Sequence, residues 1–365
     1  PMKRMKKDIA RVMDEAVARG ETPCALTLLW RRGEEKFFHT SGYADLGRNL
    51  PVARNTLFRL YALTQPMIAV AAMTLAERGL LDLNAPVNEY LPGFTEQRVA
   101  LSDTKSAPAR RPTLVRDLFS LTSGLPCGGN ATPAERAMDA LFRELEAESR
   151  AGDPSDTVTV ANRIGRLPLA FHPGARWQQG VSADVLGAVV QAITLMPLDE
   201  YLSATLFEPL GMTDTGFYVP EDQRERLATL YERKDGILSP VLFEPGGLED
   251  CLTRRRFLSG SGLVSTADDV LRFARMLLGE GEGCGERILS PHAVAWLTHN
   301  HLNGEQLASG FAEAADGYGF GGLMRVLAEP ARSDSLGVAG EYGWDGLAGA
   351  YMTVCPKEDM ALLVF

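Results

Sequence analysis

Residues 57–79 read LFRLYALTQPMIAVAAMTLAERG, and the ten residues after the proline contain a single polar side chain. A helix with so little polar surface is buried on nearly all sides, so this segment predicts a helix in the core. Pro66 fits the first turn of a helix, where its missing N–H costs no hydrogen bond, and Gly79 suits the residue just past the end. The helix therefore begins close to Ala62.

The start of this helix is a favourable place for a reactive group or an anion. The first backbone N–H groups of a helix have no partners within it, and the helix dipole gives that end a partial positive charge. The hydroxyl groups of Tyr61 and Thr64 flank Ala62. Because no lysine or histidine stands beside them in the sequence, we expect Tyr61 to pack and Thr64 to support the helix start, with neither activated as a nucleophile.

Composition and charge limit the class of protein. The chain has 365 residues, 45% hydrophobic and 23% charged, which indicates a soluble globular protein with a large core. No apolar run reaches the roughly 18 residues of a membrane helix, so we expect no membrane association. The net charge of −10 argues against a nucleic-acid partner. The basic N-terminus leads into an amphipathic pattern rather than an apolar signal core, so we expect a cytoplasmic protein.

The cysteine and histidine patterns predict no metal centre and no cofactor. His299 and His301 are two residues apart, which is not the helical spacing of a metal-binding pair. An odd, scattered set of cysteines without a C-x-x-C pair is typical of free thiols in a reducing compartment. The cysteines are Cys24, Cys127, Cys251, Cys284 and Cys355.

Strand patterns stand at both ends of the chain and helical patterns between them. This order predicts an α+β fold, in which a mainly antiparallel sheet built from the two ends is flanked by helices and carries a large helical insertion. We expect residues 1–60 and 258–365 to form the sheet region and 61–257 the mainly helical region, with a cleft between them. Predicted strands are 25–31, 36–40, 319–327, 338–342, 350–354 and 360–365; predicted helices are 3–19, 81–94, 113–121, 133–149, 183–194, 198–206, 267–278 and 290–297; 95–112 is predicted to be an exposed loop.

Several further motifs follow the opening helix in a fixed order. They are FHPGARW at 171–177, FEPLGMTDT at 207–215, GSGLVSTADD at 260–269 and YGWDG at 342–346. With residues 57–79, they make the chain resemble the serine β-lactamase and penicillin-binding-protein-like superfamily over nearly its whole length. Within it, the class C-like and esterase branch is the most similar. The resemblance implies the α+β fold described above.

The resemblance also implies where catalytic groups would stand. The superfamily opens its buried helix with Ser-x-x-Lys, and a tyrosine follows Pro-Gly-x-x-Trp. These positions fall on Ala62, Gln65 and Gln179. A methyl group cannot be acylated, and a neutral amide cannot act as a base near neutral pH. The usual proton-handling side chains are therefore missing from this chain.

The third motif of the superfamily falls on Trp344, Asp345 and Gly346. Asp345 departs from the usual pattern, and its charge would disfavour a substrate carboxylate nearby. The superfamily's oxyanion hole uses backbone N–H groups, which carry over to Ala62 and Leu347. Backbone donors survive side-chain replacement, so a carbonyl or carboxylate could still be held there.

Our main hypothesis is a non-hydrolytic pseudoenzyme that binds a small ligand or a partner in this cleft. Two alternatives remain: an active esterase, β-lactamase or acyltransferase with an unrecognised nucleophile, and a structural or oligomerising protein whose side chains fill the pocket. The sequence does not indicate an oligomeric state. The basic run 254–256 is either a solvated face or an anion-binding rim. The candidate pocket residues are Tyr61, Ala62, Gln65, Gln179, Trp344, Asp345, Gly346 and Leu347.

Overall fold

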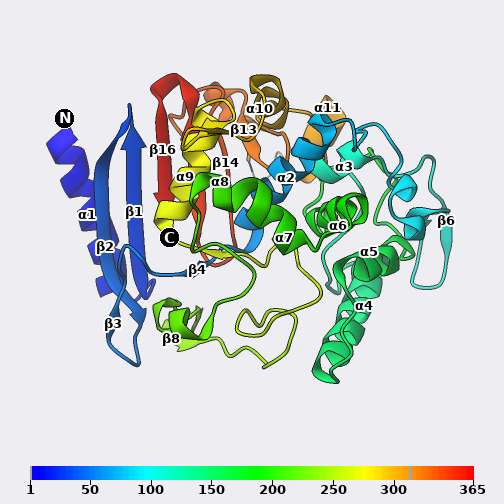
Figure 1. The fold of residues 1–365 in the computed structure, drawn as a ribbon, viewed down its shortest axis with the longest axis horizontal. Coiled ribbons are helices and arrows are strands. Elements are labelled where there is room, and N and C mark those ends of the chain that lie inside the picture. Colours follow the sequence, from blue (N-terminus) through cyan, green and yellow to red (C-terminus); the bar gives the residue numbers. More distant parts are fainter. Residues whose placement is uncertain (1, 312–314) are drawn as a thin grey trace.

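The computed structural model describes residues 2–311 and 315–365. Within these ranges an eight-stranded antiparallel sheet has the order β12-β13-β14-β15-β16-β1-β2-β3. The two ends of the chain meet where β1 pairs with β16 (Figure 1). The predicted fold class is therefore confirmed. The strands are β1 (Cys24–Arg31), β2 (Glu34–Asp45), β3 (Leu50–Pro51), β12 (Tyr318–Phe320), β13 (Arg325–Leu327), β14 (Tyr342–Asp345), β15 (Tyr351–Cys355) and β16 (Met360–Val364).

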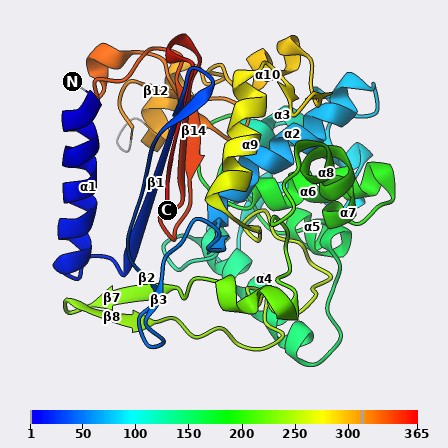
Figure 2. The same ribbon diagram turned by 60° about the vertical axis from the view of Figure 1, so that its left-hand side comes forward.

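Helices cover both faces of this sheet. The N-terminal helix α1 (Met2–Ala18) packs on β2, and α9 (Ala267–Leu278) packs on β15 and β16. Figure 2 shows the two helices on opposite sides of the sheet. Because both faces are covered, the central residues 26–29 of β1 are all buried, which explains the nearly unbroken apolar run in that strand.

The helix at the centre of the fold is α2 (Gln65–Glu77), as the sequence predicts. Every residue from Gln65 to Met73 is buried, and Pro66 lies in the first turn. The helix contacts α6, α7 and α10. The other helices are α3 (Val115–Ser120), α4 (Pro133–Arg150), α5 (Thr157–Gly165), α6 (Ser182–Thr194), α7 (Leu198–Leu202), α8 (Glu208–Leu210), α10 (Pro291–Leu297) and α11 (Gly304–Gln306).

Short strand pairs connect these layers. The pair β4 and β9 matters most for the site, because it joins the residues just before α2 to the segment just before α9. The short strands are β4 (Phe58–Arg59), β5 (Arg98–Ala100), β6 (Ser106–Pro108), β7 (Tyr231–Lys234), β8 (Ile237–Pro240), β9 (Val264–Ser265), β10 (Glu282–Gly283) and β11 (Glu286–Arg287).

Two predicted segments between 81 and 112 are wrong. Residues 81–94 form two short 3₁₀ turns, Val87–Glu89 and Pro92–Phe94, because the backbone before each turn is extended and no continuous helix can form. Residues 95–112 are not a plain loop, because they contain the hairpin of β5 and β6. The hairpin is anchored by the Ala100 N–H, which donates to the Leu169 carbonyl at 2.9 Å.

Three further predictions differ from the structure. The strand predicted over 319–327 is two strands, β12 and β13, which pair antiparallel with Phe320 opposite Arg325. The helix predicted over 198–206 ends at Leu202 and continues as a π-helical turn, Ser203–Phe207. The strand predicted over 338–342 begins only at Tyr342, since Gly340 turns the chain with a φ of +94° just before it. Along the described chain, no single helix is long and apolar enough to cross a membrane. The helical segments Ser182–Thr194 and Leu198–Leu210 reach the required length and apolar composition only when they are taken together, and they are bent by 84° relative to each other.

Candidate functional site

A 3₁₀ turn, Tyr61–Thr64, leads directly into α2. Tyr61 has a φ of +47°, a left-handed conformation that is uncommon outside glycine and clusters at functional sites. The turn is tied to the segment before β9, because the Leu60 N–H donates to the Leu263 carbonyl at 2.9 Å and the Leu263 N–H donates to Thr64 Oγ1 at 3.2 Å. Thr64 is fully buried, so its hydroxyl supports the helix start.

The end of β14 lies directly against this turn. A Cβ placed on Gly346 would be 2.0 Å from the Leu60 carbonyl oxygen and 3.3 Å from the Tyr61 Cβ. The backbone N–H groups of Ala62 and Leu347 donate no hydrogen bond to any described residue. The first and third predicted motifs therefore meet, and each contributes one uncommitted backbone donor.

The close approach at Gly346 is testable. Gly346→Ala is expected to lower the free energy of unfolding by about 2 kcal/mol, since the new methyl group meets a backbone oxygen that cannot move aside. Chemical denaturation measures the loss. Gly304→Ala is the matched control, because nothing lies within 4 Å of its Cβ position. Equal stability of the two variants would contradict the packing of β14 on the turn.

Phe320 of β12 brings the second and third motifs together. Its ring contacts Trp177 edge-on at a centroid distance of 5.5 Å and Trp344 at 5.1 Å. Gln179 follows two residues after Trp177. Its segment is held on the other side by the Gln178 N–H, which donates to the Leu121 carbonyl at 2.9 Å. Phe320 was not among the predicted pocket residues, since a tail-strand phenylalanine carries no sequence signal of its role.

Each of the three motif positions holds a buried polar atom without a partner. Gln65 Oε1, Gln179 Oε1 and Trp344 Nε1 form no hydrogen bond within the described ranges. A buried polar group left unpaired costs about 1–3 kcal/mol, so most such groups in proteins are matched by water or by a bound molecule. The three motif positions thus each retain an unpaired polar group, in addition to the two free backbone N–H groups.

The remaining predicted pocket residues lie further out. Trp344 is buried and its neighbour on the strand, Asp345, is exposed, as expected for successive residues on opposite faces. Asp345 Oδ2 pairs with Arg325 Nη1 at 3.2 Å, so its negative charge is balanced locally. Leu347 is 88% exposed. Burial raises the pKa of Tyr61 to about 12, which keeps its hydroxyl neutral at neutral pH.

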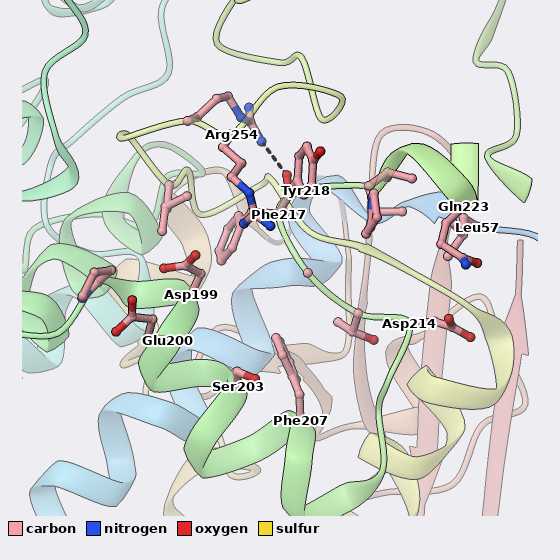
Figure 3. A pocket seen from close by; sticks show the side chains of 18 of the residues that line it. Leu57, Asp199, Glu200, Ser203, Phe207, Asp214, Phe217, Tyr218, Gln223 and Arg254 are labelled. Carbon is pink, nitrogen blue, oxygen red and sulfur yellow. Dashed lines mark hydrogen bonds between the residues drawn. The ribbon is translucent and has the colours of Figure 1, made fainter. Parts of the chain in front are cut away.

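A separate cavity lies away from these residues. It has a volume of about 610 Å³ and lies between α7, the segment 213–220 and the basic run 254–256. Figure 3 shows Asp199 and Glu200 on one side and Arg254 on the other. The Arg254 guanidinium stacks over the Tyr218 ring at 4.3 Å. None of the predicted pocket residues lines this cavity.

Other polar candidates have structural partners. The rings of His299 and His301 bond to the carbonyls of Ala295 and Trp296 at 2.5 and 2.6 Å. In the part of the chain that the structure describes, no group of three His, Cys, Asp or Glu side chains could hold a metal ion, and the five cysteines are free thiols.

Asp184 on α6 was not among the predicted residues. Its carboxylate accepts hydrogen bonds from the Gly260 N–H at 2.9 Å and from the Ser259 hydroxyl at 3.0 Å. Its signal was an acidic residue in an otherwise apolar helix pattern.

A buried helix preceded by a tight turn, with the end of the inner strand β14 against that turn, is the arrangement expected for the serine β-lactamase and penicillin-binding-protein-like class. The chain belongs to the β-lactamase family, whose model matches residues 9–365. The predicted family is thus confirmed. The match includes both ends of the sheet and every motif discussed above.

The chain is similar to curated proteins along most of its length. It is 36% identical to protein Rv1367c of Mycobacterium tuberculosis and 31% identical to esterase EstB of Burkholderia gladioli, in each case over 93% of this chain and 84% of the other protein. Among solved structures, EstCE1, a hydrolase with promiscuous acyltransferase activity, has a TM-score of 0.82 at 26% identity and covers all of this chain and 93% of its own. Relatives of this family thus include esterases and acyltransferases.

Proposed function

We propose that this protein is a non-hydrolytic member of the β-lactamase family that binds a small ligand in the cleft between the sheet region (1–60 and 258–365) and the helical region (61–257). One observation carries the proposal: the positions assigned to the serine, lysine and tyrosine hold Ala62, Gln65 and Gln179, and both glutamines have buried oxygens without partners. The residues fit a polar binding surface better than a proton relay.

The chemistry of these side chains supports a loss of hydrolysis. Ala62 has no hydroxyl to attack a carbonyl. The side-chain amides of Gln65 and Gln179 do not titrate near neutral pH, so neither can act as the base that takes the proton from a nucleophile. Loss of the nucleophile from a cooperative constellation lowers the rate by a factor on the order of 10⁶, and further losses add little. Once the serine is gone, nothing maintains the lysine and the tyrosine, which explains why all three positions differ together.

The backbone supports retained binding. The free N–H groups of Ala62 and Leu347 lie on two segments that touch. We infer that they correspond to the backbone donors with which the family polarises a carbonyl oxygen. The helix dipole of α2 adds positive potential at the same place. A carbonyl or carboxylate compound would satisfy these donors without being cleaved.

Hydrolysis assays test the proposal. With nitrocefin, p-nitrophenyl acetate and p-nitrophenyl butyrate, the purified protein is expected to show the same rate as buffer, because it lacks an activated nucleophile. Turnover well above buffer that disappears on Ala62→Trp, a change that blocks the cleft, would overturn the proposal.

A second candidate is an active hydrolase or acyltransferase with another nucleophile. It is favoured by the two free backbone donors and by the similarity to esterase EstB and EstCE1. Mass spectrometry after treatment with a fluorophosphonate separates the two candidates. A covalent adduct on any residue would favour the hydrolase, whereas an unmodified mass is the result expected here.

A further inference from the structure

A small cavity adjoins Tyr61, the residue before Ala62. Its volume is about 60 Å³, and its lining includes Arg59, Tyr61, Glu249, Arg255 and Ser261. Arg59 comes from β4 and Arg255 from the loop before β9, so the pairing of these two strands brings the two arginines to one place. About two water volumes fit this space, which is the size of one small polar group such as a carboxylate.

Arg59 has no polar partner in the structure. Its guanidinium stacks over the Phe243 ring at 4.1 Å, and its Nε is buried without a hydrogen bond. No described carboxylate lies within 4 Å of the guanidinium, and it donates no hydrogen bond to a described residue. An arginine presents five N–H donors in a planar fork, and those of Arg59 are not taken up by other described side chains or carbonyls.

Arg255 is more deeply placed and forms no ion pair within 4 Å with a described residue. Its terminal nitrogens donate to the carbonyls of Leu248 and Phe217, and its Nε is buried without a partner. Burial is the main cause that lowers the pKa of this guanidinium, and the charge of Arg59 lowers it further. Asp250 and Glu249 act in the opposite direction on Arg255. Both guanidinium groups nevertheless line the same small space, and each has a buried Nε that lacks a hydrogen-bond partner among the described residues.

Two acidic groups, Asp250 and Glu249, lie near this pair, but neither forms an ion pair within 4 Å with Arg59 or Arg255 in the described ranges. The Asp250 carboxylate is occupied, because it accepts from the N–H groups of Gly246 and Leu252 and from the Thr253 hydroxyl at 2.7–2.9 Å. Glu249 lines the cavity but is exposed and forms no ion pair with a described residue. Its charge still acts on Arg255 and Tyr61, so Glu249 would compete with an incoming anion.

We propose that Arg59 and Arg255 bind the carboxylate of a small organic acid in this cavity. A guanidinium fork matches the two oxygens of a carboxylate, and hydrogen bonds between charged groups are the strong ones. The proposal rests on the proposed function only in placing the remainder of the ligand past Tyr61, towards Ala62. The anion site itself stands on the two arginines.

Calorimetric titration of the full chain at low salt tests the site. Sodium butyrate is expected to bind with a millimolar Kd, and butyramide, its neutral counterpart, is expected not to bind. Arg59→Gln is expected to weaken butyrate binding about tenfold or more. This variant should fold, because the Arg59 side chain makes no hydrogen bond to a described residue and its backbone pairing with β9 is unchanged. Arg254→Gln is the matched control: it removes the same charge from an arginine that also stacks on an aromatic ring, but outside this cavity.

A variant that is expected to bind butyrate more tightly makes the test independent of any loss of stability. Glu249→Gln removes the competing carboxylate and is expected to tighten butyrate binding about threefold. No butyrate binding by the wild type, equal binding of butyramide, or equal affinity in the Arg59 and Arg254 variants would overturn the proposal. Ester turnover with an intact butyrate site would refute only the proposed function, and an inert protein that fails to bind butyrate would refute only this inference.

Discussion

The triple variant Ala62→Ser, Gln65→Lys, Gln179→Tyr is expected to form a covalent fluorophosphonate adduct and to hydrolyse p-nitrophenyl butyrate. The turn before α2, the free N–H groups of Ala62 and Leu347 and the packing of β14 on that turn are already present. Supplying the hydroxyl, the amine and the phenol completes the constellation of the family. We expect a gain on the order of 10³ over the wild type, short of the roughly 10⁶ that an intact constellation contributes.

The control for this experiment keeps Ala62. A double variant with only Gln65→Lys and Gln179→Tyr has the base without the nucleophile, so it should take up no label. Intact-mass measurement followed by peptide mapping locates the adduct, and the expected site is residue 62. A triple variant that melts like the wild type and yet remains unlabelled would show that these three positions do not form the site.

Much of the fold could be predicted because its main elements have strong local signals. Pro66 and Gly79 bracket an apolar run that only a buried helix explains, and α9 has the predicted bounds because Thr266 caps it, accepting a hydrogen bond from the Asp269 N–H. The errors fall where tertiary contacts decide. Val99 is buried in a hairpin because the hairpin docks on Leu169, which the polar sequence around it does not reveal.

The site was only partly predictable. Motif spacing named Ala62, Gln65 and Gln179, because each lies at a fixed distance from a recognisable neighbour. Phe320 and Arg59 were not found, since their importance depends on what surrounds them in space. A missing hydrogen-bond partner, as at Arg59, leaves no trace in a sequence pattern and is visible only once the packing is known.

Asp184→Ala is expected to lower the free energy of unfolding by about 3 kcal/mol. The Asp184 carboxylate on α6 is the acceptor for the Gly260 N–H and for the Ser259 hydroxyl, so it joins the helical region to the segment before β9. Removing it leaves two donors without an acceptor in a buried place, which is one of the larger single-residue penalties. Chemical denaturation followed by circular dichroism measures the change.

Asp184→Asn is the matched control, because an amide oxygen can still accept the Gly260 N–H while the buried charge is gone. We expect it to lose about 1 kcal/mol or less, so a loss equal to that of the alanine variant would contradict this account. A pH series adds a second readout. Burial raises the pKa of Asp184 above its ordinary value of 3.8, so the folded protein holds this proton at a higher pH than the unfolded chain does. The contribution of Asp184 to stability therefore increases as the pH falls through the folded pKa towards 3.8, and the asparagine variant should lack that increase.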